Sequence, residues 1–229
     1  MDLALYGPPG SGKGTQAERL RDRFGIPHIS TGDILRAEIA AKTDLGRQAK
    51  AIVDRGDLVS DEIMIPIVKA RLAQKDCEPG FILDGFPRTI PQAEGLDRAL
   101  EEMGRSFDRV IYLEVPVPEL VERLSDRWLC PKCGRTYGKR AEAPADGNRC
   151  RVDGAELTQR EDDRPEAAQR RIDVYLRETL PVLGHYRPVG IVADVDGTGP
   201  IDAVTERVLA ALGDLIPPSP SGRAEGGRP

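Results

Sequence analysis

A short apolar run near the start of the chain is followed at once by a glycine-rich loop, and this pair limits the folds that the chain can adopt. The run Leu3–Tyr6 has the character of a buried strand, the loop Gly7–Thr15 reads GPPGSGKGT, and the next residues have helical periodicity. The loop matches G-x-x-x-x-G-K at Gly7, Gly12 and Lys13. In such a loop the backbone N–H groups, the following helix and the lysine bind phosphate. The sequence therefore predicts an α/β fold that binds a nucleotide at its first strand.

One position departs from the usual loop. Gly14 occupies the place of the Ser or Thr whose hydroxyl normally contacts Mg²⁺, and Thr15 comes one residue later. We therefore expect Mg²⁺ to be held in another way, through water and the carboxylate of Asp84.

Strands and helices alternate along the remaining chain. Apolar runs predict three more strands, at Gly80–Phe86, Arg109–Val115 and Ile191–Gly197. Charged stretches predict helices at Ile34–Arg55, Asp61–Gln74, Pro91–Met103, Pro118–Asp126 and Arg164–Tyr186. This alternation is typical of a parallel sheet covered by helices on both faces. The segment between Trp128 and Asp163 interrupts the rhythm and predicts an inserted subdomain, while the Pro-, Gly- and Ser-rich residues Pro217–Pro229 predict disorder.

Charge and hydropathy narrow the class of protein. The net charge is −5, and proteins that bind nucleic acid are usually basic, so no nucleic-acid partner is expected. No apolar run approaches the ~18 residues that span a bilayer, and the N-terminus lacks the basic flank of a signal peptide. We therefore expect a cytoplasmic protein without a membrane contact. The four cysteines then favour a metal site or free thiols over disulfides.

Three of these cysteines form a pattern in the inserted segment. Cys130 and Cys133 are spaced as C-x-x-C, and Cys150 and Asp153 repeat the spacing after sixteen residues. Two such pairs suit a tetrahedral Zn²⁺, which accepts carboxylate as well as thiolate ligands. Asp146 and Glu156 are alternative fourth ligands that do not keep the spacing, and a three-cysteine remnant beside a simple turn is the competing interpretation. We expect a structural zinc site of Cys130, Cys133, Cys150 and Asp153, which helps a subdomain with little core to fold.

Four motifs in order resemble one family, the adenylate kinases. They are GPPGSGKGTQAERL, STGDILR (Ser30–Arg36), DGFPRT (Asp84–Thr89) and QREDD (Gln159–Asp163). The resemblance runs from the first residues to about Leu212, and the inserted segment resembles the long lid of the bacterial form. It implies a core (1–29, 60–125 and 164–216), a small helical AMP-binding domain (30–59) and a zinc-bearing lid (126–163). It also implies a monomer that transfers phosphoryl from MgATP to AMP, with two ADP as products.

The resemblance further assigns site residues. The catalytic set is Lys13, Arg88, Arg123, Arg127, Arg160 and Arg171. The ATP-binding set is Gly10, Ser11, Gly12, Lys13, Gly14, Thr15, Arg123, Arg127, Thr136, Tyr137 and Gly199. The AMP-binding set is Thr31, Arg36, Asp57, Leu58, Val59, Gly85, Phe86, Pro87, Arg88, Gln92, Arg160 and Arg171.

Some of these assignments carry further expectations. Arg123 and Arg127 are four apart and should share one helical face. Asp162 and Asp163 should close the lid hinge against the arginines. Many relatives carry Lys in place of Asp57, and Lys or Gln in place of Gly199, so Gly199 can contact adenine only by its backbone. His28 and His185 are expected to be structural, Trp128 to pack at the edge of the lid, and Cys77 to be an ordinary thiol.

Three other functions compete with an AMP kinase that uses ATP. The first is the same chemistry with GTP as donor. The second is a P-loop ATPase that drives a zinc-ribbon nucleic-acid or interaction module, and the third is a P-loop switch protein whose lid only binds a partner. The motifs DGFPRT and TGD disfavour the last two, because a second phosphate site has no use in either.

Overall fold

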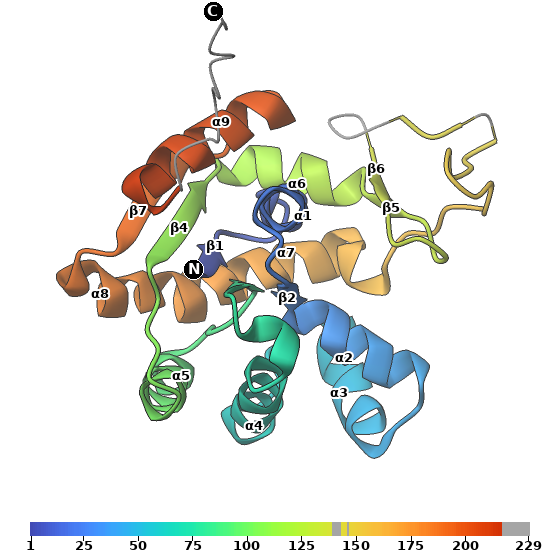
Figure 1. The fold of residues 1–229 in the computed structure, drawn as a ribbon. Helices are drawn as coiled ribbons and strands as arrows, with labels where there is room; N and C mark the ends of the chain where they lie inside the picture. Colours follow the sequence, from blue (N-terminus) through green and yellow to red (C-terminus); the bar gives the residue numbers. More distant parts are fainter. Residues whose placement is uncertain (139–142, 146, 217–229) are drawn as a thin grey trace, which may run out of the picture.

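The computed structural model describes residues 1–138, 143–145 and 147–216. Its centre is a sheet of parallel strands (Figure 1). The strand order is β2-β3-β1-β4-β7. The strands are β1 (Asp2–Tyr6), β2 (His28–Ser30), β3 (Phe81–Asp84), β4 (Arg109–Glu114) and β7 (Val192–Asp196). The disorder predicted for Pro217–Pro229 concerns residues outside the described ranges.

Helices cover both faces of this sheet, which confirms the predicted fold class. They are α1 (Lys13–Phe24), α2 (Thr31–Ala40), α3 (Asp44–Asp54), α4 (Asp61–Leu72), α5 (Ile90–Glu102), α6 (Val117–Ser125), α7 (Pro165–Val174), α8 (Leu183–Tyr186) and α9 (Ile201–Leu212). A π-helical turn spans Tyr175–Thr179, and short 3₁₀ turns lie at Lys75–Cys77, Glu161–Asp163, Leu180–Val182, Arg187–Val189 and Gly213–Leu215. None of the helices in the described ranges is long and apolar enough to cross a bilayer.

The core lies on the two faces of the sheet, as the alternation of β1 shows. Leu3 and Leu5 pack with α1 and α9 on one face, whereas Ala4 and Tyr6 pack with α4, α5 and α8 on the other. All four residues are at most 3% exposed. Because successive side chains of a strand point to opposite faces, an apolar run with no polar gap is what a doubly covered strand requires.

Several elements differ from the sequence-based predictions. The stretch Ile34–Arg55 is two helices, because the Thr43 hydroxyl accepts a hydrogen bond from the Gly46 amide at 3.0 Å and so starts α3. Strand β2 was missed because it has only three residues. Helix α9 was not predicted either. The returning helix is also less regular than predicted, since Pro181 lacks the N–H that a continuous α-helix needs.

The inserted segment has its own small cluster. Strands β5 (Trp128–Leu129) and β6 (Thr136–Tyr137) pair antiparallel, and they extend away from the sheet (Figure 1). The buried residues of the cluster are Cys130, Tyr137, Cys150 and Leu157, with Trp128 and Ala155 packed against them. Trp128 therefore packs as expected, and the cluster is small enough that a metal would contribute much of its stability.

Candidate active site and metal centre

The phosphate loop joins β1 to α1 in the predicted order. Gly12 precedes the helix with φ +94°, a left-handed conformation that glycine adopts without strain. The Lys13 ammonium donates to the carbonyls of Gly7 at 2.6 Å and Pro8 at 2.9 Å, so it lies within the loop. Burial lowers the pKa of Lys13 to about 8, although the nearby carboxylate of Asp84 opposes this shift. The loop thus holds a cation where a phosphate would lie.

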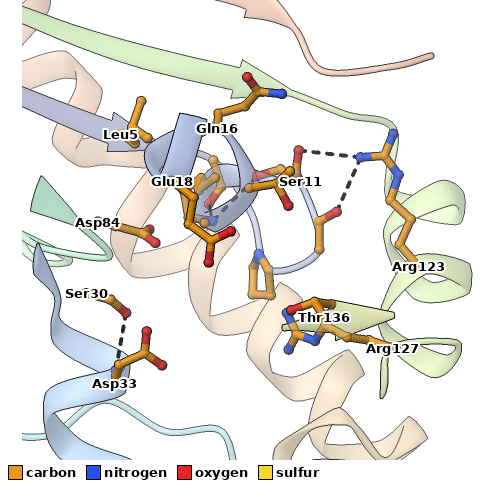
Figure 2. Close-up of a pocket in the computed structure, with 18 of the residues that line it drawn as sticks. Leu5, Ser11, Gln16, Glu18, Ser30, Asp33, Asp84, Arg123, Arg127 and Thr136 are labelled. Atoms are coloured by element: carbon orange, nitrogen blue, oxygen red, sulfur yellow. Dashed lines mark hydrogen bonds between the residues drawn. The ribbon is translucent and has the colours of Figure 1, made fainter. Parts of the chain in front are cut away.

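A large cavity of about 900 Å³ opens over this loop (Figure 2). In Figure 2, Arg123, Arg127 and Thr136 approach it from one side, and Asp33 and Asp84 approach it from the other. Every residue of the predicted ATP-binding set lines it, namely Gly10, Ser11, Gly12, Lys13, Gly14, Thr15, Arg123, Arg127, Thr136, Tyr137 and Gly199. The predicted residues come from the loop, from α6, from the lid and from the segment after β7, and the fold brings them to one place.

A second cavity, of about 60 Å³, adjoins the first. Ten predicted AMP-binding residues line it, namely Thr31, Arg36, Asp57, Leu58, Val59, Gly85, Phe86, Arg88, Gln92 and Arg171. The other two, Pro87 and Arg160, line the large cavity. Arg36, Arg88 and Arg171 line both cavities, so three guanidinium groups lie where the two meet.

Arg123 and Arg127 reach the large cavity from different backbone contexts. Arg123 lies on α6, and its guanidinium donates to the carbonyls of Gly10 at 3.3 Å, Ser11 at 3.4 Å and Gly197 at 3.0 Å (Figure 2). Arg127 lies two residues beyond Ser125, where α6 ends. The prediction that the two share a helical face is therefore wrong, because the chain turns into the lid between them. Both side chains still line the same cavity.

A buried carboxylate holds two of the arginines. Asp163 has no exposed side-chain surface and accepts hydrogen bonds from Arg127 Nε at 2.7 Å and Arg171 Nη1 at 2.7 Å. A further Arg127 nitrogen donates to the same carboxylate. Asp162 lies 3.0 Å from Arg171. The acidic pair therefore contacts Arg127 and Arg171 directly before α7, and its role in a lid hinge stays a prediction.

The arginines on the AMP side lie close to one another and have few anionic partners. Burial, followed by the neighbouring charge of Arg171, lowers the pKa of Arg88 to about 10, and burial with the charge of Arg36 does the same to Arg160. Asp33 lies 2.5 Å from Arg36 and 3.7 Å from Arg160. The buried Nε of Arg160 has no hydrogen-bond partner within the described ranges. Such a group of cations is a site for a multiply charged anion.

Gly85 lets the AMP-side groups approach closely. Its φ is +77°, and a Cβ here would lie 3.0 Å from the Arg88 guanidinium and 3.3 Å from the Thr31 hydroxyl. The Gly85 carbonyl accepts from Arg88 Nε at 2.6 Å and from Thr31 Oγ1 at 2.9 Å. The backbone conformation favours glycine, and a side chain here would also crowd Arg88 and Thr31.

Two predicted AMP-binding side chains are already engaged within the protein. The Gln92 amide donates to Asp61 at 2.7 Å and accepts from the Arg88 backbone at 2.8 Å. Asp57 lies 2.5 Å from Arg170 of α7. Sequence reasoning missed Asp61 and Arg170, because nothing in the order of residues shows which distant side chain an amide or a carboxylate will meet.

The two histidines each contact a carboxylate. His28 Nε2 lies 3.2 Å from Asp84 in the wall of the large cavity, and His185 Nε2 lies 2.6 Å from Asp97. Both contacts fit structural roles. Burial raises the pKa of Asp84, but the hydrogen bond from His28 and the charge of Lys13 bring it below its usual value. Asp84 is therefore ionised and available to a cation in the cavity.

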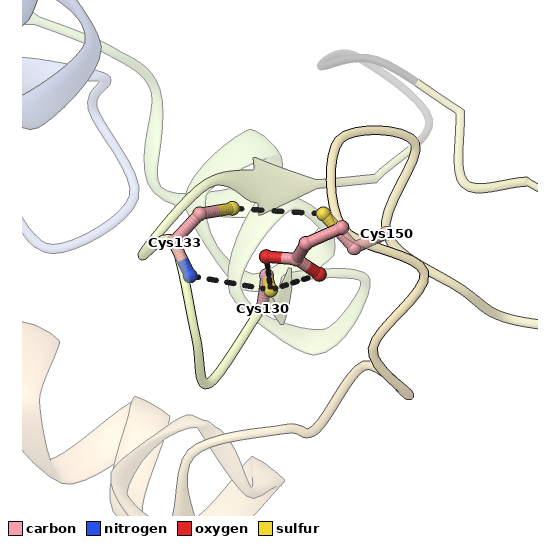
Figure 3. A group of neighbouring side chains, drawn as sticks. Cys130, Cys133 and Cys150 are labelled. Carbon is pink, nitrogen blue, oxygen red and sulfur yellow. Dashed lines mark hydrogen bonds between the residues drawn. The ribbon is translucent and has the colours of Figure 1, made fainter.

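The cysteine segment gathers four ligand atoms at one point (Figure 3). One atom each from Cys130, Cys133, Cys150 and Asp153 lies within 4.8 Å of the others. The Cys133 and Cys150 sulfurs are 3.5 Å apart, and the Cys130 sulfur is 3.2 Å from an Asp153 oxygen. Tetrahedral zinc with bonds of about 2.3 Å to sulfur separates its sulfur ligands by about 3.8 Å. Both the donor set and its spacing therefore fit Zn²⁺.

The fourth member of this group is Asp153, the residue that the spacing predicts. The Ala155 amide donates to Asp153 Oδ1 at 2.9 Å, and this hydrogen bond lowers the pKa of Asp153 to about 2. The carboxylate is therefore ionised, as a metal ligand must be. Glu156 is not a member of the group, and Asp146 lies outside the described residues.

Comparison with known proteins agrees with this geometry. The family model described as adenylate kinase matches residues 5–191. The adenylate kinase of Methanosarcina mazei is 50% identical over 212 residues, which are 93% of this chain and 98% of that protein. The adenylate kinase of Archaeoglobus fulgidus is 49% identical over the same shares of the two chains, and that of Staphylococcus epidermidis is 46% identical over 94% of this chain and all of its own. The chain belongs to the adenylate kinase family.

Proposed function

We propose that the protein catalyses the reversible transfer of a phosphoryl group from MgATP to AMP, which yields two ADP. The carrying observation is the pair of adjoining cavities, one over the phosphate loop and one beside α2, with Arg36, Arg88 and Arg171 lining both. An ATPase or a switch protein has no use for a second phosphate site. The relatives named above, all adenylate kinases, support the same activity.

The arginines and Lys13 supply most of the catalysis. Phosphoryl transfer spreads negative charge over the transferred group, so an enzyme must align the two nucleotides and place cations around that group. Lys13 and the loop amides hold the outer ATP phosphates, while Arg36 and Arg88 hold the AMP phosphate. Arg123, Arg127, Arg160 and Arg171 surround the group in transfer. The AMP phosphate already carries an ionised oxygen, so no general base is needed.

Adenylate kinases use Mg²⁺ with ATP, and it neutralises phosphate charge when bound. Gly14 offers no hydroxyl to this ion, whereas Asp84 lines the same cavity and is ionised. We assign Asp84 to hold Mg²⁺ through water. An Asp84→Asn variant should need a higher Mg²⁺ concentration for half-maximal rate. An unchanged Mg²⁺ dependence would contradict this assignment.

A coupled assay of ADP formation tests the reaction itself. ADP should form from ATP with AMP and Mg²⁺, and not from ATP alone. AMP should exceed CMP, UMP and GMP by orders of magnitude as acceptor, and ATP should exceed GTP as donor. Equal turnover without AMP would favour the ATPase alternatives. Lys13→Met should lose about 10²–10³-fold in kcat, as when one preorganised donor to the developing charge is removed.

A matched pair of arginine variants tests the AMP side. Arg88→Ala should raise the KM for AMP and lower kcat with little effect on ATP binding. Arg98→Ala, on the exposed face of α5, removes the same charge elsewhere and should change neither. Equal effects of the two changes would show that only the net charge of the protein matters.

We also propose that residues 30–59 and 126–163 close over a core of 1–29, 60–125 and 164–216. The support is the distribution of the arginines, which come from all three parts. Distance labels on the lid and the core should approach each other when a two-nucleotide mimic binds, and an unchanged distance would contradict the hinge. The monomeric state and the cytoplasmic location stay predictions.

We propose finally that Cys130, Cys133, Cys150 and Asp153 bind a structural Zn²⁺. All four positions are filled by protein atoms, so the site offers no open position for catalysis. The metal would hold the two ends of the lid together where the apolar cluster is small.

A further inference from the structure

The Tyr137 side chain lies between the cysteine site and the large cavity. Tyr137 is completely buried in the lid cluster, and its hydroxyl lies 3.2 Å from the Cys150 sulfur. The same hydroxyl accepts a hydrogen bond from the Arg151 backbone N–H at 2.9 Å. The residue also borders the ATP cavity, together with its neighbours from Cys133 to Gly138. The expected contact between Tyr137 and the ATP base stays a prediction. The Tyr137 hydroxyl itself points to the Cys150 sulfur.

We infer that Tyr137 is a positioning residue whose hydroxyl holds the Cys150 ligand and links metal occupancy to the ATP cavity. This inference rests on the zinc site proposed above. A thiolate bound to a metal can only accept hydrogen bonds, so Tyr137 must be the donor to Cys150. The hydroxyl then uses its lone pair for the Arg151 amide, and both of its roles are satisfied together.

Hydrogen bonds to ligand atoms commonly control how firmly a metal is held. Removing such an outer partner costs about 10- to 100-fold in metal affinity. Within the described part of the lid, Cys150 receives hydrogen bonds from the Tyr137 hydroxyl and from the Val152 amide at 3.4 Å. The hydroxyl is the closer of these two donors, and it belongs to β6. It is therefore the direct connection between this ligand and the strand that borders the cavity.

The link should operate in both directions. Strand β6 is held by two kinds of contact. Its backbone pairs with Trp128 of β5, and the Tyr137 hydroxyl contacts the Cys150 sulfur. Loss of the metal would release Cys150 and with it one anchor of the cavity wall. By thermodynamic reciprocity, a nucleotide that orders this wall must then strengthen metal binding by the same factor.

Zinc release into a chromophoric chelator tests the inference. Tyr137→Phe keeps the ring and its packing but removes the hydroxyl, so zinc should leave at least about tenfold faster than from the wild type. Tyr6→Phe is the matched control, because Tyr6 is also buried, lines the same cavity and has no partner for its hydroxyl among the described residues. It should release zinc at the wild-type rate. A two-nucleotide mimic with Mg²⁺ should slow release more in the wild type than in Tyr137→Phe.

Cobalt substitution gives a readout that does not depend on activity or on a folding defect. The hydroxyl stabilises electron density on the Cys150 sulfur, so its removal should move the sulfur-to-cobalt charge-transfer band to longer wavelength. Equal release rates and an unmoved band in Tyr137→Phe would overturn the inference alone. A wild-type protein that retains no zinc would overturn both the zinc proposal and this inference.

Discussion

The carboxylate of Asp163 offers the sharpest test of how the arginine cluster is held together. It has no exposed side-chain surface, and it accepts hydrogen bonds from two guanidinium groups that are only 20% and 18% exposed, those of Arg127 and Arg171. Asp163→Asn keeps the size but removes the charge and turns an NH₂ group toward one of the donors. Both arginines then lose the counter-charge of Asp163, although Arg171 keeps its contact with Asp162.

The size of the effect follows from the burial. Removing one member of a buried ion pair costs about 3–5 kcal/mol, because the remaining charge stays desolvated. Asparagine retains one acceptor oxygen, so we expect the lower end, about 3 kcal/mol. For a chain of this size each kcal/mol shifts Tm by about 2–4 °C, which gives a fall of roughly 6–12 °C. Asp202→Asn is the control, since Asp202 is 83% exposed in its pair with Arg19 and should cost at most about 1 kcal/mol.

Thermal unfolding followed by circular dichroism, with and without a two-nucleotide mimic, measures this. In the presence of the ligand the difference between wild type and Asp163→Asn should narrow, because phosphate oxygens can replace the missing carboxylate beside Arg127 and Arg171. Equal Tm values for the Asp163 and Asp202 variants would refute the reasoning. A difference that ligand leaves unchanged would show that these arginines do not contact phosphate.

Three further predictions concern other parts of the site. Because burial lowers the pKa of Lys13 to about 8, its charge is present below that pH and lost above it. The kcat/KM for ATP should therefore fall as pH rises through about 8. In Lys13→Arg this fall should disappear, since arginine stays charged. Metal analysis of the purified protein should find about one zinc per chain. Asp153→Ala should lose this zinc, whereas Asp153→Cys should retain it. Retention of zinc in both variants would mean that Asp153 is not a ligand. Asp57→Arg and Arg170→Asp should each raise the KM for AMP. If the 2.5 Å contact between the two side chains positions the AMP side, the double variant should restore the KM. No recovery in the double variant would assign the effect to Asp57 itself.

Much of the fold could be predicted because it depends on local patterns. A buried parallel strand is a short apolar run, and Leu3–Tyr6 is such a run directly before a glycine loop. Two of the places where the prediction failed have local causes too. The Thr43 cap starts α3 as a separate helix after α2, and a three-residue strand such as β2 carries too few positions for a period to be seen.

The candidate site was predictable to the extent that motifs fix positions in the chain. The residues that the motifs assigned to ATP binding all line one cavity, and the repeated spacing selected the four side chains that form the candidate metal site. Partners were not predictable. The pairing of Asp57 with Arg170, and of Gln92 with Asp61, depends on how α7 and α4 pack against distant segments, and no spacing within the chain encodes it.

Carboxylates within the arginine cluster explain how the protein can keep several part-buried guanidinium groups close together before its substrates bind. A buried guanidinium without a counter-charge destabilises the folded state. Ion pairs offset this: Asp163 and Asp162 contact Arg171, and Asp33 contacts Arg36. A phosphate that binds to Arg36, Arg127 or Arg171 therefore competes with the carboxylates that already contact these side chains. Asp162 and Asp163 lie in the segment that leads out of the lid, so a phosphate bound by Arg127 and Arg171 would weaken the contacts at that boundary. If the lid closes as we propose, this exchange would make the position of the lid depend on phosphate, through the same ion pairs that stabilise the free protein.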